Sequence, residues 1–209
     1  MCGMRMIRTH IVLLVLLIAG TLSGCSDFRV VKSDFGFPIS EKSREAPLPL
    51  VVGIKVDGQT LSGGFGDMGP TFASRLTNSG LFKSVFYPVR SDDKLDLLME
   101  TNFSGNFAAD SGSFAKGFLT GFFMFLPAPF VEYEHHYKTS AVIRVSRRGE
   151  QLKTYSAGSD ITIEMKVFAP HTEVEKQGVA AATNSLMDRI IAQLNNDRAF
   201  LGGLILEVK

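Results

Sequence analysis

Two stretches of the sequence hold side chains that could bind a metal ion or a nucleotide. In the first, Glu132, Glu134 and His136 alternate, so on a strand they share one face and leave His135 on the other. Such ligands spread over roughly 13 Å, whereas one ion needs all of them at about 2 Å. A site would need His171 or another residue brought in by folding. We therefore expect no metal site and a polar, solvated strand face.

The second stretch, Gly64–Gly69, matches the pattern GxGxxG between a predicted strand and a predicted helix. A dinucleotide site requires the strand to run directly into the first glycine, but several residues separate Asp57 from Gly64. Strand–helix units also do not repeat further along the chain. We expect a flexible glycine loop and no nucleotide cofactor.

Catalytic groupings have little support in the sequence. There is no GxSxG motif, and Asp92-Asp93 in Arg-Ser-Asp-Asp-Lys is typical of a turn. An enzyme would need a polar pocket that gathers His135, His136 or His171 with carboxylates. We expect a protein that is not an enzyme and has no catalytic residue.

One cysteine stands where covalent chemistry is expected. A short basic head with Arg5 and Arg8 precedes the apolar run Ile11–Leu22, which is followed by small residues. This order is typical of a secretory signal, and the run is short of the roughly 20 residues that span a bilayer. The stretch Leu22-Ser23-Gly24-Cys25 resembles the lipobox of bacterial lipoproteins. Residues 1–24 are then the signal peptide; a plain secreted protein and a transmembrane anchor are the alternatives.

The lipobox resemblance implies that Cys25 is acylated, with palmitate among its chains, and becomes the first residue of the mature protein. Bacterial lipoproteins carry two or three acyl chains, whereas one chain binds a bilayer only marginally. The next residue is Ser26 rather than Asp. By the enterobacterial sorting rule this favours the outer membrane, with the domain facing the periplasm. No cofactor is expected apart from this covalent lipid.

Composition limits the partners. Removal of residues 1–24 lowers Lys+Arg from 22 to 20 against 21 Asp+Glu, a net charge of −1. This balance gives no electrostatic footprint for nucleic acid. Cys2 is also removed, so no free thiol remains for a disulfide and the domain must be held together by burial and strand pairing.

The mature chain divides into a lipidated cysteine with its tether, residues 25–49, and one domain, residues 50–209. Alternation of apolar and polar residues predicts half-buried strands, namely 50–56, 85–89, 95–104, 137–146, 152–157, 160–167 and 204–208. Arg147–Glu150 is predicted as a hairpin turn.

Two stretches repeat apolar residues every three or four positions and predict helices. The first begins near Pro70 and ends with Gly80 as a left-handed cap. The second begins with Thr172 and Glu175 as a capping box and runs to Asn195-Asn196. The predicted fold is α+β, a mainly antiparallel sheet with two helices packed against it.

The stretches FASRLTNSGLFKSVFYPV, from Phe72, and LDLLMETNFSG, ending at Gly105, carry a family resemblance. A helix ending in Ser-Gly-Leu-Phe, a short strand and a strand beginning Asp-Leu-Leu-Met resemble a group of envelope lipoproteins. The group includes the activators of penicillin-binding proteins and the curli secretion lipoprotein, whose domain is similar to the N-terminal domain of the Tol translocation protein. The resemblance covers residues 50–106, implies a non-enzymatic domain that docks onto envelope proteins, and transfers no functional residue.

The run from Phe114 to Phe130 is rich in phenylalanine and has no charge after Lys116. It is too short to span a bilayer as a helix, and two prolines end it. It is a buried connection under the sheet, a membrane-dipping hairpin or interfacial helix, or a contact for a protein or a second copy. We expect the membrane or partner contact to involve four residues, Phe118, Phe122, Phe123 and Phe125.

These features together predict a non-enzymatic, lipid-anchored lipoprotein that serves as an accessory or adaptor to a cell-envelope assembly. The expected partners are the membrane, unidentified envelope proteins and, as one option, a second copy of the chain. The alternative is a lipid-binding or lipid-transport lipoprotein with an apolar groove guarded by the phenylalanine-rich run.

Overall fold

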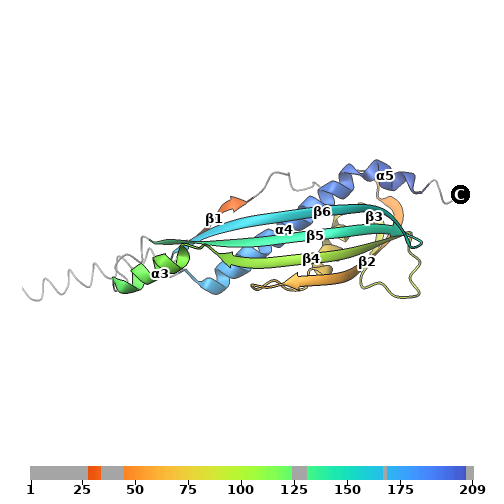
Figure 1. Cartoon of the computed structure of the whole chain (residues 1–209). Coiled ribbons are helices and arrows are strands. Elements are labelled where there is room, and N and C mark those ends of the chain that lie inside the picture. Colours follow the sequence, from red (N-terminus) through yellow and green to blue (C-terminus); the bar gives the residue numbers. More distant parts are fainter. Residues whose placement is uncertain (1–27, 34–44, 124–130, 167–168, 206–209) are drawn as a thin grey trace, which may run out of the picture.

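The computed structural model describes residues 28–33, 45–123, 131–166 and 169–205. These residues form an α+β fold, as expected, in which long strands are flanked by helices (Figure 1). The elements in chain order are β1 (Phe28–Ser33), β2 (Leu48–Leu61), α2 (Gly69–Ser79), β3 (Phe82–Phe86), β4 (Leu97–Ala109), α3 (Ser113–Phe122), β5 (Glu132–Arg147), β6 (Glu150–Lys166), α4 (His171–Asn196) and α5 (Arg198–Gly203).

The strands form one sheet in the order β1-β6-β5-β4-β2-β3. The pairs β4–β5, β5–β6 and β6–β1 are antiparallel, whereas β2 lies between β3 and β4 and is parallel to both. The prediction of a mainly antiparallel sheet is therefore only roughly right, and the sheet is mixed. The parallel part arises because α2 carries the chain back across the sheet before β3 begins, as a crossover must.

Strict alternation along β5 decides which face is buried. Tyr137, Ala141 and Ile143 are at most 2% exposed, while Lys138 and Arg144 at the alternate positions are exposed. The β5–β6 hairpin closes on Arg148 and Gly149, both with positive φ (51° and 87°). This is the backbone that a two-residue hairpin turn requires, and it confirms the predicted turn.

Helices α2 and α4 cover the apolar face of the sheet. The side of α4 that contacts it repeats every three or four residues and is at most 1% exposed at Val174, Ala182, Leu186, Ile190 and Leu194. Helix α2 buries Phe72 and Leu76 and ends at Gly80 with φ 67°, as predicted. Within the described residues, no helix combines the length and apolar character needed to cross a membrane.

Three local predictions are wrong. Helix α4 starts at His171, with no side-chain cap at the preceding Pro170, so the Thr172–Glu175 capping box does not form. Strand β6 is continuous where two strands were expected, because it pairs with β5 along its whole length. Leu204 is buried in a turn that follows α5, not in an edge strand; residues 206–208 lie outside the described residues.

The segment 25–49, expected as a tether, contributes a strand. Residues Phe28–Ser33 pair antiparallel with β6, starting with Phe28 opposite Met165. Residues 1–24, Cys25 and Ser26 lie outside the described residues.

Candidate functional site

The candidate site lies at one end of the sheet. We call this end the tip. There β4 and β5 continue together until Ala109 pairs with His135, and α3 connects them (Figure 1). The opposite end holds the β5–β6 turn. In Figure 1, α3 and α5 lie at opposite ends of the molecule.

Helix α3 contacts strand β5 at Lys116 and Gly117. The Lys116 ammonium donates a hydrogen bond to the Glu132 carbonyl oxygen (3.0 Å). Thr120 is only 2% exposed, and its hydroxyl donates to the Lys116 carbonyl (2.7 Å). Gly117 leaves space in which a Cβ would lie 3.8 Å from the Tyr133 hydroxyl. These three positions lie at spacings of one, three and four residues and therefore share one side of the helix.

The other side of α3 presents its apolar side chains to solvent. The exposed fractions are 84% for Phe114, 65% for Phe118, 52% for Leu119, 70% for Phe122 and 53% for Phe123. The rings of Phe118 and Phe122 stack with centroids 6.2 Å apart. A buried connection is therefore wrong for the described part of the run. We call these five residues the aromatic face of α3.

Of the residues expected to contact a membrane or partner, Phe118, Phe122 and Phe123 belong to the aromatic face. Phe125 lies outside the described residues. The structure thus places Phe118 and Phe122 on α3 and Phe123 directly after its last residue.

The N-terminal end of β1 lies at the same end of the sheet as α3. Phe28 pairs with Met165 of β6, and Met165 pairs with Tyr133 of β5, which lies beside α3. Next to Phe28, Arg29 forms an ion pair with Glu164 (2.8 Å). Cys25 precedes Phe28 by three residues, and three extended residues reach at most about 11 Å. The described residue nearest to Cys25 along the chain is therefore at the tip.

The histidines near the tip are split between the two faces of the sheet, as the alternation predicts. His135 lies against Phe107, with ring centroids 4.9 Å apart, and 6.2 Å from the ring of His171. Burial, and to a lesser extent His171 and His136, lower the pKa of His135. On the other face, His136 shares a hydrogen bond with Thr162 (3.1 Å). Folding does bring His171 to His135, but no group of metal-binding side chains forms among the described residues.

The glycine-rich loop is packed rather than flexible. Phe65 and Met68 are buried, and Asp67 accepts hydrogen bonds from Gln59 (2.6 Å) and from the Gly69 amide (2.9 Å). The Glu175 carboxylate of α4 lies directly over Gly64. Two carboxylates at this loop repel a phosphate, which argues against a nucleotide site. Asp93 also behaves as expected, because its carboxylate accepts the Arg90 amide (2.7 Å) within a turn.

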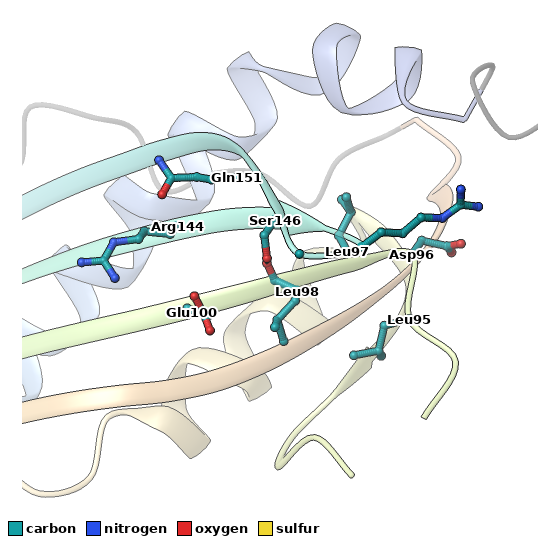
Figure 2. Close-up of a pocket in the computed structure, with 10 residues that line it drawn as sticks. Leu95, Asp96, Leu97, Leu98, Glu100, Arg144, Ser146 and Gln151 are labelled. Atoms are coloured by element: carbon teal, nitrogen blue, oxygen red, sulfur yellow. The ribbon is translucent and has the colours of Figure 1, made fainter. Parts of the chain in front are cut away.

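A hollow of about 510 Å³ lies at the end of the sheet opposite the tip, on the face not covered by α4. Figure 2 shows Arg144, Ser146 and Gln151 of the β5–β6 hairpin beside Leu98 and Glu100 of β4. The lining carries both signs of charge, with Asp96 and Glu100 against Arg144 and Arg148. We call it the far-end hollow.

Ion pairs extend from the far-end hollow onto β2. Lys55 contacts both Glu100 and Asp57 (3.1 Å each), and Arg144 lies 3.9 Å from Asp57. None of these residues was predicted from the sequence to belong to a site. The available signal was charge at alternate positions of 95–104 and 137–146, which placed Glu100 and Arg144 on one polar face without showing that the strands are neighbours.

Comparisons with known proteins find similar solved structures but no family. No protein-family model matches the sequence, and a search of curated proteins finds no significant match. Among solved structures, a protein described as a neuraminyllactose-binding hemagglutinin homologue from Helicobacter pylori is 12% identical, with a TM-score of 0.49 over 80% of this chain and 97% of that one.

Two further similar structures are described as lipoproteins. The minor lipoprotein from Acinetobacter baumannii is 9% identical, with a TM-score of 0.40 over 72% of this chain and 91% of that one. Rare lipoprotein B from Shewanella oneidensis is 13% identical, with a TM-score of 0.33 over 69% of this chain and 98% of that one. At these identities and TM-scores the likeness does not indicate what this chain binds.

Proposed function

We propose that this protein is a non-enzymatic, lipid-anchored lipoprotein of the bacterial envelope that serves as an adaptor for an envelope assembly. The observation that carries the proposal is the position of β1. The Leu-Ser-Gly-Cys stretch ends three residues before Phe28, and Phe28 pairs into the sheet at the tip. An acylated Cys25 therefore attaches the domain to the membrane by one defined end.

The opposite end of the sheet is the part that an envelope partner can reach. The far-end hollow lies there, and its lining of Asp96, Glu100, Arg144 and Arg148 suits a protein segment with side chains of both signs. Such mixed charge favours specificity and orientation more than raw affinity, as an adaptor requires. With Ser26 after the cysteine, the outer membrane is the proposed location and the domain faces the periplasm.

Metabolic labelling tests the anchor. Cells expressing the protein are grown with labelled palmitate, and membranes are separated by sedimentation. We expect label on the wild type, and none on Cys25→Ala, which should leave the membrane fraction. An unlabelled wild type, or Cys25→Ala that still sediments with membranes, would contradict the lipid anchor.

Site-specific photocrosslinking in intact cells tests the adaptor role. A photoreactive residue at Gln151, in the far-end hollow, is compared with one at Lys138, which is exposed on the same sheet but nearer the tip. We expect a discrete crosslinked protein from position 151 that is lost when Arg144→Glu is added. Equal crosslinking from both positions would argue against a docking site in the hollow.

A lipid-binding protein is the second candidate, favoured by a hollow of about 550 Å³ between the glycine-rich loop and α4. Met68, Val179 and Ala180 give it an apolar part, while Asp67, Glu175 and Lys176 form a charged part. Its lining does not include the aromatic face of α3, so that face is not a guard for this hollow. Native mass spectrometry separates the candidates: co-purified phospholipid supports lipid binding, and its absence supports the adaptor.

A further inference from the structure

We propose that α3 is an interfacial helix that inserts its aromatic face into the headgroup region of the bilayer to which Cys25 is attached. The inference rests on the proposed lipid anchor and adds a second, non-covalent contact with the membrane. It fixes the orientation of the domain, because one flexible attachment point leaves a body free to rotate and two do not.

Helix α3 turns its apolar side to solvent and not to the domain. An amphipathic helix of a globular domain buries its apolar side and exposes its polar side. Helix α3 does the reverse: Lys116 donates to β5, Gly117 lies near Tyr133 and Thr120 is buried, while Phe118 and Phe122 remain 65% and 70% exposed. Contiguous exposed apolar surface of this kind marks a contact site.

The position of Cys25 makes lipid the expected contact of the aromatic face. Cys25 is within about 11 Å of Phe28, and Phe28, Met165 and Tyr133 form one row across the sheet beside α3. Acyl chains on Cys25 therefore place the aromatic face within reach of the same bilayer. A protein partner would have to displace α3 from lipid that is already adjacent to it.

The length of α3 and the charges beside it also suit a helix that lies in the membrane interface. The ten residues of α3 extend for about 15 Å, which suits a helix lying in the interface and not one spanning the membrane. The charges on the paired strand ends beside α3 balance, with Lys116, Arg29 and Lys166 against Glu132, Glu134 and Glu164, and Arg29 forms an ion pair with Glu164. Insertion should thus depend on apolar burial and not on anionic lipid, which makes zwitterionic vesicles a sufficient probe.

The sequence contains no tryptophan, so a single introduced tryptophan reports its own surroundings. The full-length lipidated protein carrying Phe122→Trp is reconstituted into phosphatidylcholine vesicles with brominated acyl chains, which quench tryptophan at short range. The matched control is Phe86→Trp: Phe86 is 41% exposed and pairs with Gly53, which pairs with Leu98 at the far-end hollow. Phe114→Trp repeats the measurement at the other end of α3, in case position 122 does not tolerate the larger ring.

We expect blue-shifted emission at position 122, at least about twofold stronger quenching than at position 86, and little change between low and high salt. Co-flotation with the vesicles without quenching at 122 or 114 would overturn the proposal while leaving the anchor intact. Equal quenching at both ends of the sheet would also overturn it. Absence of flotation in every variant would refute the anchor, and this inference with it.

A second copy of the chain is the remaining occupant that the experiment must separate from lipid. Cys25→Ala protein with Phe122→Trp is measured in buffer without vesicles over a range of concentrations. Emission typical of exposed tryptophan at all concentrations supports the proposal. A blue shift that grows with concentration would show that another copy covers the aromatic face, and would overturn it.

Discussion

Helices α3 and α4 have the same kind of sequence pattern and opposite relations to the domain. Helix α4 spans 26 residues and buries its apolar residues against the sheet, with Leu186 and Leu194 fully inaccessible. Helix α3 spans ten residues and turns Phe114 and Phe122 to solvent at 84% and 70% exposure. Periodicity therefore shows that a helix has an apolar side, and the partner of that side has to be found from packing.

The surroundings of the two helices differ accordingly. Helix α4 packs on β5 and β6, and its apolar side is buried there. Helix α3 meets the sheet at the end of β5, where Lys116 donates to the Glu132 carbonyl and Gly117 lies near Tyr133. The sheet that buries the apolar side of α4 is therefore not what the apolar side of α3 faces.

The largest difference in stability between variants of the two helices is expected when a buried side chain of α4 is shortened. Leu186→Ala removes a side chain with no exposed surface and leaves a cavity, which should lower the free energy of unfolding by about 2–5 kcal/mol. Chemical denaturation followed by circular dichroism measures this. A loss below about 1 kcal/mol would show that α4 is not an essential part of the core.

Replacing a glycine by alanine should change stability in opposite directions in the two helices. A Cβ at Gly178 of α4 would overlap the ring of Tyr137, which is 1% exposed and cannot move aside. Gly178→Ala should therefore destabilise by about 1–3 kcal/mol despite its better helix propensity. At Gly121 of α3 no atom lies within 4 Å, and Gly121→Ala should stabilise by about 0.5–1 kcal/mol. Equal changes in both variants would contradict the packing described for α4.

A smaller effect is expected where the start of α4 meets the tip. Burial lowers the pKa of His135, so the folded protein binds a proton at this residue less readily than the unfolded chain. Stability at this site is therefore fully present above the ordinary histidine pKa of about 6.5 and is lost as pH falls through the folded pKa. The melting temperature should decrease by up to about 2–4 °C between pH 7.5 and 5.5, and less in His135→Gln. An unchanged pH dependence in that variant would assign the effect to other groups.

The smallest effect on stability should come from the aromatic face itself. Phe122→Ser with Phe123→Ser replaces side chains that are 70% and 53% exposed, so the free energy of unfolding should change by less than about 0.5 kcal/mol. Urea denaturation measures this change, with Leu186→Ala as the matched buried control. A loss of several kcal/mol would show that α3 packs in the core after all.

Much of the fold follows from local patterns, and the strand order does not. Alternation identified the residues that face the core, and Gly80 and Arg147–Glu150 identified a helix end and a turn. The position of β2 between β3 and β4 depends on which strands meet after folding, and alternation carries no such information. The capping box fails for a related reason: Glu175 lies over Gly64 in a tertiary contact, at the expense of the local one.

The residues that make up the candidate site could be predicted from the sequence, but their arrangement in space could not. The phenylalanine-rich run was evident, but its outward direction depends on the side of α3 on which Lys116 contacts the Glu132 carbonyl and Thr120 is buried. The four-residue spacing of Lys116 and Thr120 could have placed them on one side of the helix. The far-end hollow depends on the lateral pairing of β4 with β5, which brings Glu100 opposite Arg144.

The length of β5 determines how far from the bilayer a partner would contact the far-end hollow. Its 16 residues extend for roughly 50 Å from the tip to the hairpin turn. In the orientation proposed above, the sheet acts as a rigid spacer with lipid at its base. Any assembly that engages Arg148 or Gln151 would then do so several nanometres above the bilayer, at a distance set by strand length and not by a flexible linker.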